Sequence, residues 1–270
     1  MRLLVELRAL CDCVYDLMYH HKLQGFLYRL LAGSTYAGLH DRRGYKFFCF
    51  SNIFPSLDMQ EGDLRRFLVS SPDTGLIEAL VEQLDKLQRS GERVNVGEMS
   101  FSVKGVSVLE PRVGRSCVLA AGTPIVVRIP RANYARYGIE PPEDYKYVYW
   151  RKQYPFDAFV RQLEDNLFKK YNTFYNTRLE SFPIFEQFVF QKQVCNHLVI
   201  DGREVKVFGS LWRFTFNYLY GVKQKVVQFG LDTGLGELNS IGYGFINITK
   251  VQEQRNVTRC ESSRRLCLQE

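Results

Sequence analysis

The sequence predicts an α+β protein in which one βαββαβ arrangement occurs twice. Apolar residues alternate between strand and helix spacing, in the order strand, helix, strand, strand, helix, strand, through the first half of the chain. The same order recurs in the second half, and a glycine-rich stretch, GLGELNSIGYGF, precedes its last strand. These observations predict one domain over residues 1–114, a second over 115–252 and a polar tail over 253–270.

The first half opens with a strand over residues 2–7, where an apolar LLV run lies between Arg2 and Glu6. A helix over 23–31 follows, because its apolar residues recur at i, i+3, i+4, i+7 and i+8, and Gly33 ends it. The rest of this half is predicted to contain an aromatic strand over 46–54 stopped by Pro55, a strand over 64–70, a helix over 76–87 stopped by Gly91, and β-structure over 93–109.

The second half repeats this order with longer connections. Its predicted elements are a strand over 118–129, a Tyr- and Pro-rich loop over 134–150, a helix over 156–167, a hairpin of 184–194 with 205–220 through Asp201-Gly202, a short helix over 222–229 and a strand over 243–251. The sequence therefore predicts two ferredoxin-like domains in tandem.

The composition indicates a folded, basic protein. Apolar residues make up 46% of the chain, and the formal net charge is +7. The pI of about 9.0 favours a polyanionic partner, with nucleic acid ahead of an anionic membrane. The seven cysteines include no CxxC pair, which argues against a zinc ribbon, and no metal site is predicted. The longest apolar run, over 117–127, is too short to cross a bilayer, so we expect a cytoplasmic protein with no membrane partner.

The glycine-rich stretch is spaced Gly-x-Gly, five residues, Gly-x-Gly. A dinucleotide fingerprint needs GxGxxG between a strand and a helix, and a Walker A loop needs Gly-Lys-Ser/Thr. Here the loop follows a helix and precedes a strand, so no nucleotide cofactor is expected. A plain turn and a close backbone approach to phosphate both remain open.

With Leu235 and Tyr243 at its apolar positions, this C-terminal loop resembles that of the RAMP superfamily of CRISPR-associated proteins. The resemblance implies that the loop packs the last helix on the sheet and lies near bound RNA. The glycines it assigns to RNA binding are Gly234, Gly236, Gly242 and Gly244.

A second stretch, LQGFLYRLLAGSTYAGLHDRRGYKFFCFS over 23–51, resembles the archaeal branch of the CRISPR repeat-RNA processing endoribonucleases. The resemblance implies a catalytic set of Tyr28, His40 and Lys46. The residues themselves agree: Tyr28 falls about 140° from the helix's apolar stripe. His40 lies in a glycine-containing loop, and Lys46 opens an aromatic run in which an unneeded charge would be costly.

These residue types suit RNA cleavage by the RNA's own 2′-hydroxyl. The reaction needs a base, an acid and a cation near the phosphorane, and histidine can transfer protons near neutral pH. We assign His40 as general base, Tyr28 as a partner in proton transfer or positioning, and Lys46 as the stabilising cation. The family resemblance implies 2′,3′-cyclic phosphate products and no metal.

Affinity for RNA is expected to come mainly from Lys and Arg side chains that contact its phosphates. The candidates are Arg42 and Arg43 beside the proposed site and Arg128 and Arg131 in the second half; Tyr145, Tyr147 and Trp150 are candidates either for base stacking or for anchoring their loop. His20, His21 and His197 are expected on the surface.

The predicted function is that of a metal-independent endoribonuclease that cleaves precursor CRISPR RNA within its repeats. The alternative is a non-catalytic RNA-binding RAMP subunit of a CRISPR effector complex, which would have no need of the catalytic set. The expected partners are CRISPR repeat RNA and, more weakly, an effector complex or a second copy of the chain.

Overall fold

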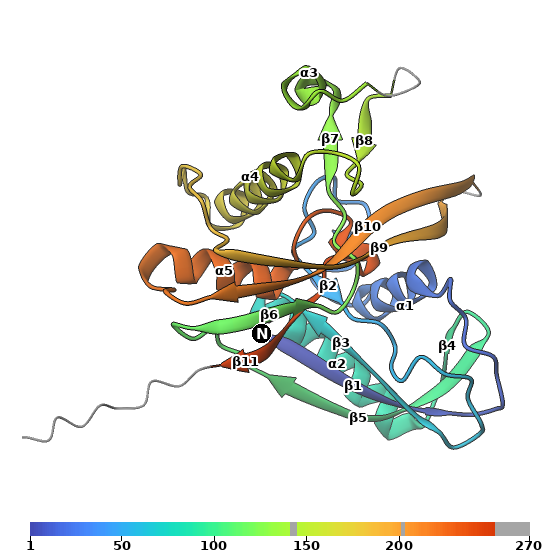
Figure 1. Cartoon of the computed structure of the whole chain (residues 1–270). Helices are drawn as coiled ribbons and strands as arrows, with labels where there is room; N and C mark the ends of the chain where they lie inside the picture. The colour runs from blue at the N-terminus through green and yellow to red at the C-terminus, as the bar shows by residue number, and fades with distance from the viewer. Residues whose placement is uncertain (141–144, 201–202, 252–270) are drawn as a thin grey trace, which may run out of the picture.

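The computed structural model describes residues 1–140, 145–200 and 203–251. They form two α+β bodies that lie against each other, with a short arm projecting from the second (Figure 1). The N-terminal body contains an antiparallel sheet of strand order β2-β3-β1-β5-β4. Its elements are β1 (Arg2–Ala9), α1 (His20–Leu31), the 3-10 turn η1 (Ala37–Leu39), β2 (Cys49–Phe50), β3 (Leu64–Ser70), α2 (Thr74–Ser90), β4 (Arg93–Val96) and β5 (Met99–Leu109). The predicted order of the first half is confirmed, with β4 and β5 forming a hairpin.

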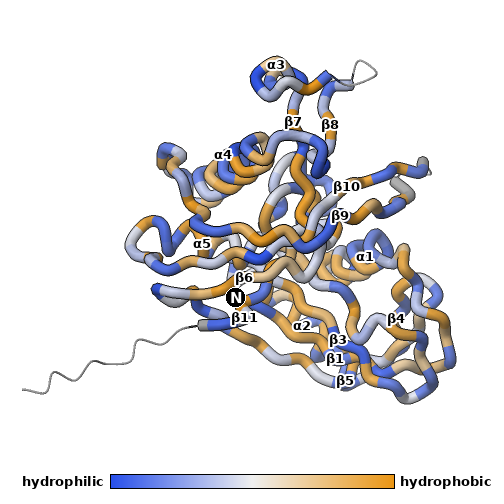
Figure 2. The backbone as a smooth tube through the Cα atoms, viewed as in Figure 1, coloured by the Kyte–Doolittle hydropathy of each residue, from blue (hydrophilic) through white to orange (hydrophobic). Residues whose placement is uncertain are grey.

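The core of this body lies between the sheet and its two helices. Leu3 and Val5 of β1 are fully buried, as is Leu23 of α1, and Figure 2 shows hydrophobic residues along β1 and β3. The α2 helix is capped at both ends, by the Asp73 side chain and by Gly91 in the left-handed conformation.

The strand predicted over 46–54 was wrong in length, because only β2 pairs with β3 as a strand. Phe47 has a positive φ of 51°, so the backbone turns immediately before β2. Lys46 precedes this turn and directs its ammonium to the backbone carbonyl of His40. The aromatic run therefore reflects burial more than strand pairing.

The C-terminal body repeats the topology. Its sheet has the order β11-β6-β10-β9, which matches β5-β1-β3-β2 of the first body. Its elements are β6 (Cys117–Ala121), β7 (Arg128–Pro130), η2 (Arg131–Asn133), α3 (Tyr134–Tyr137), β8 (Tyr147–Tyr149), α4 (Phe156–Tyr175), β9 (Gln187–Ile200), β10 (Arg203–Phe216), α5 (Gly221–Thr233), η3 (Asn239–Ile241) and β11 (Ile246–Val251). The tandem ferredoxin-like prediction is confirmed.

Two local predictions in this half were wrong. The strand predicted over 118–129 ends at Ala121, since the next two N–H groups both donate to Phe245 O and Pro124 has none to offer. The chain then crosses to pair Ile125 with Ser210. It continues into the arm, residues 128–140 and 145–149, where β7 pairs with β8. The α3 helix and β8 lie in the segment that was predicted to be a loop.

Arg2 joins the two bodies. It is 4% exposed and stacks on the ring of Phe245, and its guanidinium donates to Asn247 Oδ1 at 2.6 Å and to the carbonyls of Leu231 and Ile246. Burial lowers its pKa to about 10. The first strand is therefore fixed to the last helix and last strand.

The predicted domain boundary near residue 114 stays a prediction. The Asp201-Gly202 turn and the tail over 253–270 lie outside the described residues. In the described ranges, no helix combines the length and the hydrophobicity that a membrane crossing requires.

Candidate active site

Tyr28, His40 and Lys46, predicted from the sequence, lie together in the structure. The rings of Tyr28 and His40 meet edge to face, with centroids 5.0 Å apart. The Lys46 ammonium lies 4.9 Å from the Tyr28 ring centroid and donates to the backbone carbonyl of His40 at 2.6 Å. Tyr28 comes from α1, His40 from the residue after η1, and Lys46 from the turn before β2. One phosphodiester can thus face an imidazole, a phenol and an ammonium.

The imidazole of His40 is accessible and oriented. Its side chain is 67% exposed, and Nδ1 lies 2.8 Å from Asp41 Oδ1. When Nδ1 carries the proton and donates it to this carboxylate, Nε2 is left with a lone pair. That tautomer is the one a general base requires.

Gln24 was not identified as a site residue from the sequence. It is 7% exposed, and its Nε2 lies 3.4 Å from the Tyr28 hydroxyl and 3.5 Å from Ser240 Oγ. Because Gln24 is four residues before Tyr28, the two side chains share one face of α1. The amide thus links the tyrosine to the glycine-rich loop, and its place in the LQG motif was the signal that could have identified it.

A cavity of about 330 Å³ separates Lys46 from the glycine-rich loop. Its lining combines cations with backbone from both bodies: Lys46, Arg128, Lys170, Gly236, Glu237 and Ser240 are among its residues. The loop and the predicted catalytic lysine therefore face the same space.

The four glycines of the loop are buried and all have positive φ, between 69° and 91°. A Cβ on Gly242 would lie 2.4 Å from the Phe50 ring, and one on Gly236 would lie 2.4 Å from Val126 O. One on Gly244 would overlap Leu235 O, and one on Gly234 would lie 3.0 Å from Cys49 Sγ. The glycines permit close packing of the loop on β2 and on residue 126. Direct contact of these four glycines with RNA stays a prediction.

Lys170 of α4 holds the glycine-rich loop by hydrogen bonds. Its side chain is 2% exposed, and Nζ donates to Gly234 O at 2.7 Å, Gly236 O at 3.1 Å and Asn239 Oδ1 at 2.9 Å. Asn239 in turn donates to Leu235 O and Tyr243 O. A lysine continuing the apolar stripe of α4 was the signal in the sequence, and it was missed.

Burial lowers the pKa of Lys170 to about 7, with Cys49 and Glu237 opposing the shift. Between about pH 7 and its ordinary pKa of 10.5, the unfolded chain binds a proton at this site that the folded chain has lost. The free energy of unfolding contributed by Lys170 therefore rises with pH across this window. At lower pH the buried charge opposes folding.

We expect Lys170→Met to remove this rise. At pH 9 the neutral amine of wild type can donate two hydrogen bonds, so the variant should be less stable by about 1–3 kcal/mol for each acceptor that loses one. At pH 6 the difference should be smaller. Urea unfolding at both pH values measures it. Lys169→Met, one residue away and exposed, is the matched control. An unchanged pH slope in Lys170→Met would contradict the assignment.

The predicted RNA-binding arginines lie in two places. Arg42 and Arg43 are exposed beside His40, with Arg42 over the Phe47 ring. Arg128 forms an ion pair with Glu237 of the glycine-rich loop and lies over the Tyr147 ring. Arg131 is exposed on η2 of the arm. The structure thus groups the first two with the catalytic set and the last two with the arm.

Of two further predictions, the one for Trp150 is narrowed to its anchoring alternative, and the one for His20, expected on the surface, was wrong. Trp150 is 5% exposed, and its Nε1 donates to Pro155 O, so it anchors its segment and is not exposed for stacking. His20 is 7% exposed between Tyr19 and Tyr243, and burial lowers its pKa to about 4. His20 is buried because Tyr243 of the C-terminal body stacks on it, whereas Trp150 is buried by Phe159 and Trp212 of its own body.

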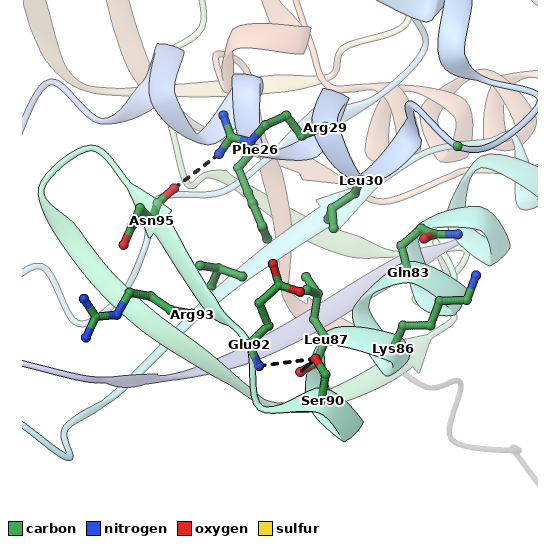
Figure 3. A pocket seen from close by; sticks show the side chains of 12 residues that line it. Phe26, Arg29, Leu30, Gln83, Lys86, Leu87, Ser90, Glu92, Arg93 and Asn95 are labelled. Carbon is green, nitrogen blue, oxygen red and sulfur yellow. Dashed lines mark hydrogen bonds between the residues drawn. The ribbon is translucent and has the colours of Figure 1, made fainter.

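A larger groove, of about 720 Å³, lies between α1, α2 and β4 (Figure 3). Arg29 reaches across it to Asn95 O, and Lys86 lies on its α2 side. None of the predicted catalytic residues lines it. Within the described ranges, no three His, Cys, Asp or Glu side chains gather as a metal site would require.

Comparison with known sequences gives consistent matches. Residues 109–248 match the family model "CRISPR associated protein Cas6, C-terminal". The chain is 32% identical over 263 residues to the CRISPR-associated endoribonuclease Cas6 2 of Methanocaldococcus jannaschii, covering 93% of this chain and 100% of that protein. It is 34% identical over 260 residues to the Cas6 endoribonuclease of Haloferax mediterranei, covering 93% of this chain and 94% of that protein.

Solved structures share the fold. One described as a CRISPR associated protein Cas6 superposes with a TM-score of 0.68 at 22% identity, over 93% of this chain and 99% of that chain. Another, described as a RAMP protein binding different RNA substrates, superposes with a TM-score of 0.69 at 18% identity, over 93% of this chain and 100% of that chain. At these identities the likeness concerns the fold alone.

Proposed function

Because the chain belongs to the Cas6 family of CRISPR-associated proteins, we propose that it is an endoribonuclease that cleaves precursor CRISPR RNA within its repeats. The observation that carries the mechanism is the meeting of Tyr28, His40 and Lys46 beside the cavity of the glycine-rich loop. A subunit that only binds RNA has no use for an accessible imidazole beside a phenol whose ring also faces an ammonium.

The proposed reaction is attack by the ribose 2′-hydroxyl on the adjacent phosphorus. The O2′–P bond forms and the P–O5′ bond breaks, which leaves a 2′,3′-cyclic phosphate on one product and a 5′-hydroxyl on the other. His40 Nε2 accepts the proton from O2′. Tyr28 shares or positions a proton near the leaving O5′. The side-chain amide of Gln24 donates a hydrogen bond to the Tyr28 hydroxyl and so helps to orient it. Lys46 offsets the negative charge that builds on the phosphorane.

The role of Lys46 follows from its surroundings. Its ammonium is held by a backbone carbonyl and a ring face, and neither partner is an anion. Its positive charge therefore remains available to a phosphate, and the π face adds a modest attraction that fixes its position. Arg42 and Arg43, which follow His40 in the same loop, supply further cations for the flanking phosphates.

Cleavage of a repeat RNA in excess EDTA tests the proposal. Purified protein is expected to cut the RNA once at full rate, and the upstream product should carry a 2′,3′-cyclic phosphate. Mass spectrometry of the product ends and gel assays with and without Mg²⁺ provide the measurement. A requirement for Mg²⁺, or products ending in a 3′-hydroxyl, would contradict the proposed chemistry.

CRISPR repeat RNA is the proposed partner. Association with an effector complex and self-association are further hypotheses, which light scattering of the protein with and without repeat RNA would examine.

A further inference from the structure

The arm and the β9–β10 hairpin share a row of aromatic rings and cations that the proposed chemistry does not use. The ring centroids of Tyr147 and Tyr149 lie 5.5 Å apart, and those of Tyr149 and Phe208 lie 6.3 Å apart. Arg128 lies 4.8 Å from the Tyr147 ring centroid, and Arg151 lies 4.1 Å from that of Phe208. These five side chains are called the aromatic ladder below.

Strand alternation places the ladder on one side of β8. Tyr147, Tyr149 and Arg151 are spaced two residues apart, so they share a face, while Val148 and Trp150 between them point into the core. Tyr147 is 38% exposed, whereas Val148 and Trp150 are 9% and 5% exposed. Tyr147 is therefore exposed on this face, whereas Tyr149, Arg151 and Phe208 are half-buried.

The ladder begins at the proposed active site. Arg128 pairs with Glu237 of the glycine-rich loop, and both line the cavity that also contains Lys46. From there the rings lead along β8 to Phe208 on β10, and the exposed Lys206 follows two residues further on the same face. Figure 1 shows β8 reaching towards β10 from the arm.

We infer that the aromatic ladder binds the single-stranded RNA on one side of the scissile phosphate and leads it from the cavity along β8 onto β10. This inference rests on the proposed function, since it extends the path of the same substrate. Aromatic rings interleaved with arginines are the arrangement by which proteins bind single-stranded nucleic acid without reading its sequence.

The ion pair with Glu237 explains why Arg128 suits stacking better than phosphate binding. Its charge is offset by the carboxylate, and its guanidinium is fixed between the loop and the Tyr147 ring. A fixed guanidinium plane is a stacking surface for a base. The phosphate contacts fall instead to Arg151, which lies over the Phe208 ring, and to the exposed Lys206 beyond the ladder.

The test measures binding, so it does not depend on cleavage. The probe is a repeat RNA with a 2′-deoxy nucleotide at the scissile position, in a short form and in a form extended by about eight nucleotides on one side or the other. We expect one extended form to bind wild-type protein more tightly than the short form. Tyr147→Ala should remove about 5- to 100-fold of that gain, as the loss of one stacked base predicts.

Tyr218→Ala is the matched control, because Tyr218 is 76% exposed and lies outside the ladder, between β10 and α5. Lys206→Ala should weaken binding of the extended RNA and lower the dependence of affinity on salt. Photocrosslinking of 4-thiouridine in the extension uses wild-type protein, so its result does not depend on whether a variant folds. Crosslinks to Tyr147, Tyr149 or Phe208 are expected.

Equal affinity of short and extended RNA, crosslinks elsewhere, or tighter binding of an extension paired into a duplex would overturn the ladder assignment. These outcomes are separable from failure of the proposed function. A protein that binds the extension through the ladder but leaves an all-ribose repeat uncut would refute the nuclease proposal and keep the ladder.

Discussion

A repeat RNA with one 2′-deoxy nucleotide at the scissile position is expected to bind and to remain uncut. The proposed nucleophile is the 2′-hydroxyl of that nucleotide, and neither His40 nor Lys46 can substitute for it. A single missing oxygen should therefore stop the reaction while leaving the phosphates that the protein grips in place. Binding is measured by filter retention and cleavage by gel electrophoresis.

The control is the same substitution one nucleotide away on either side. Those RNAs keep the attacking hydroxyl, so cleavage should continue, with at most a change in affinity where a 2′-hydroxyl contacts the protein. Cleavage of the RNA that lacks the scissile 2′-hydroxyl would show that water is the nucleophile. The assignment of a base acting on O2′ would then be wrong.

His40→Ala is expected to slow cleavage at saturating RNA by about 10²–10⁴-fold, the loss typical of a general base. The reason is geometric: His40 provides an accessible imidazole beside Tyr28 and Lys46, with Nδ1 held by Asp41. Affinity for RNA should change little, since the phosphate contacts are assigned to Lys46, Arg42 and Arg43 and the role of His40 is to accept the proton from O2′. Single-turnover rates and equilibrium binding separate the two effects.

His197→Ala is the matched control, because His197 is an exposed histidine on β9 and outside the catalytic set. A variant at Asp41, such as Asp41→Asn, should cause a smaller loss, since the exposed carboxylate orients the ring without touching the substrate. A His40→Ala rate equal to that of wild type would leave Tyr28 as the candidate base.

The elements that the sequence predicted well are those whose pattern is local. The apolar stripe from Leu23 to Leu31 gave α1, and the repeated order of strands and helices gave both sheets. Strand 46–54 failed because an aromatic run is equally suited to burial between two bodies, and Phe47 turns the backbone. Local propensity does not distinguish these outcomes.

The candidate site divides in the same way. Tyr28, His40 and Lys46 could be picked out by residue type, spacing and family resemblance, since they lie within one short stretch of chain. Lys170 could not, because lysines are almost always exposed. The sequence around it does not indicate that its side chain has three hydrogen-bond acceptors in the folded protein. Those acceptors come from residues more than 60 positions away.

The sequence by itself determined the fold class, the basic character of the chain and the residue types that suit metal-free RNA cleavage, because periodicity, charge and spacing are written along the chain. Only the tertiary structure decided that the glycine-rich loop is buried on Phe50 and held by Lys170, and that Arg128 is paired with Glu237. The physical reason is that burial and charge pairing depend on which distant segments meet. A local sequence pattern does not determine which distant residues pack against it.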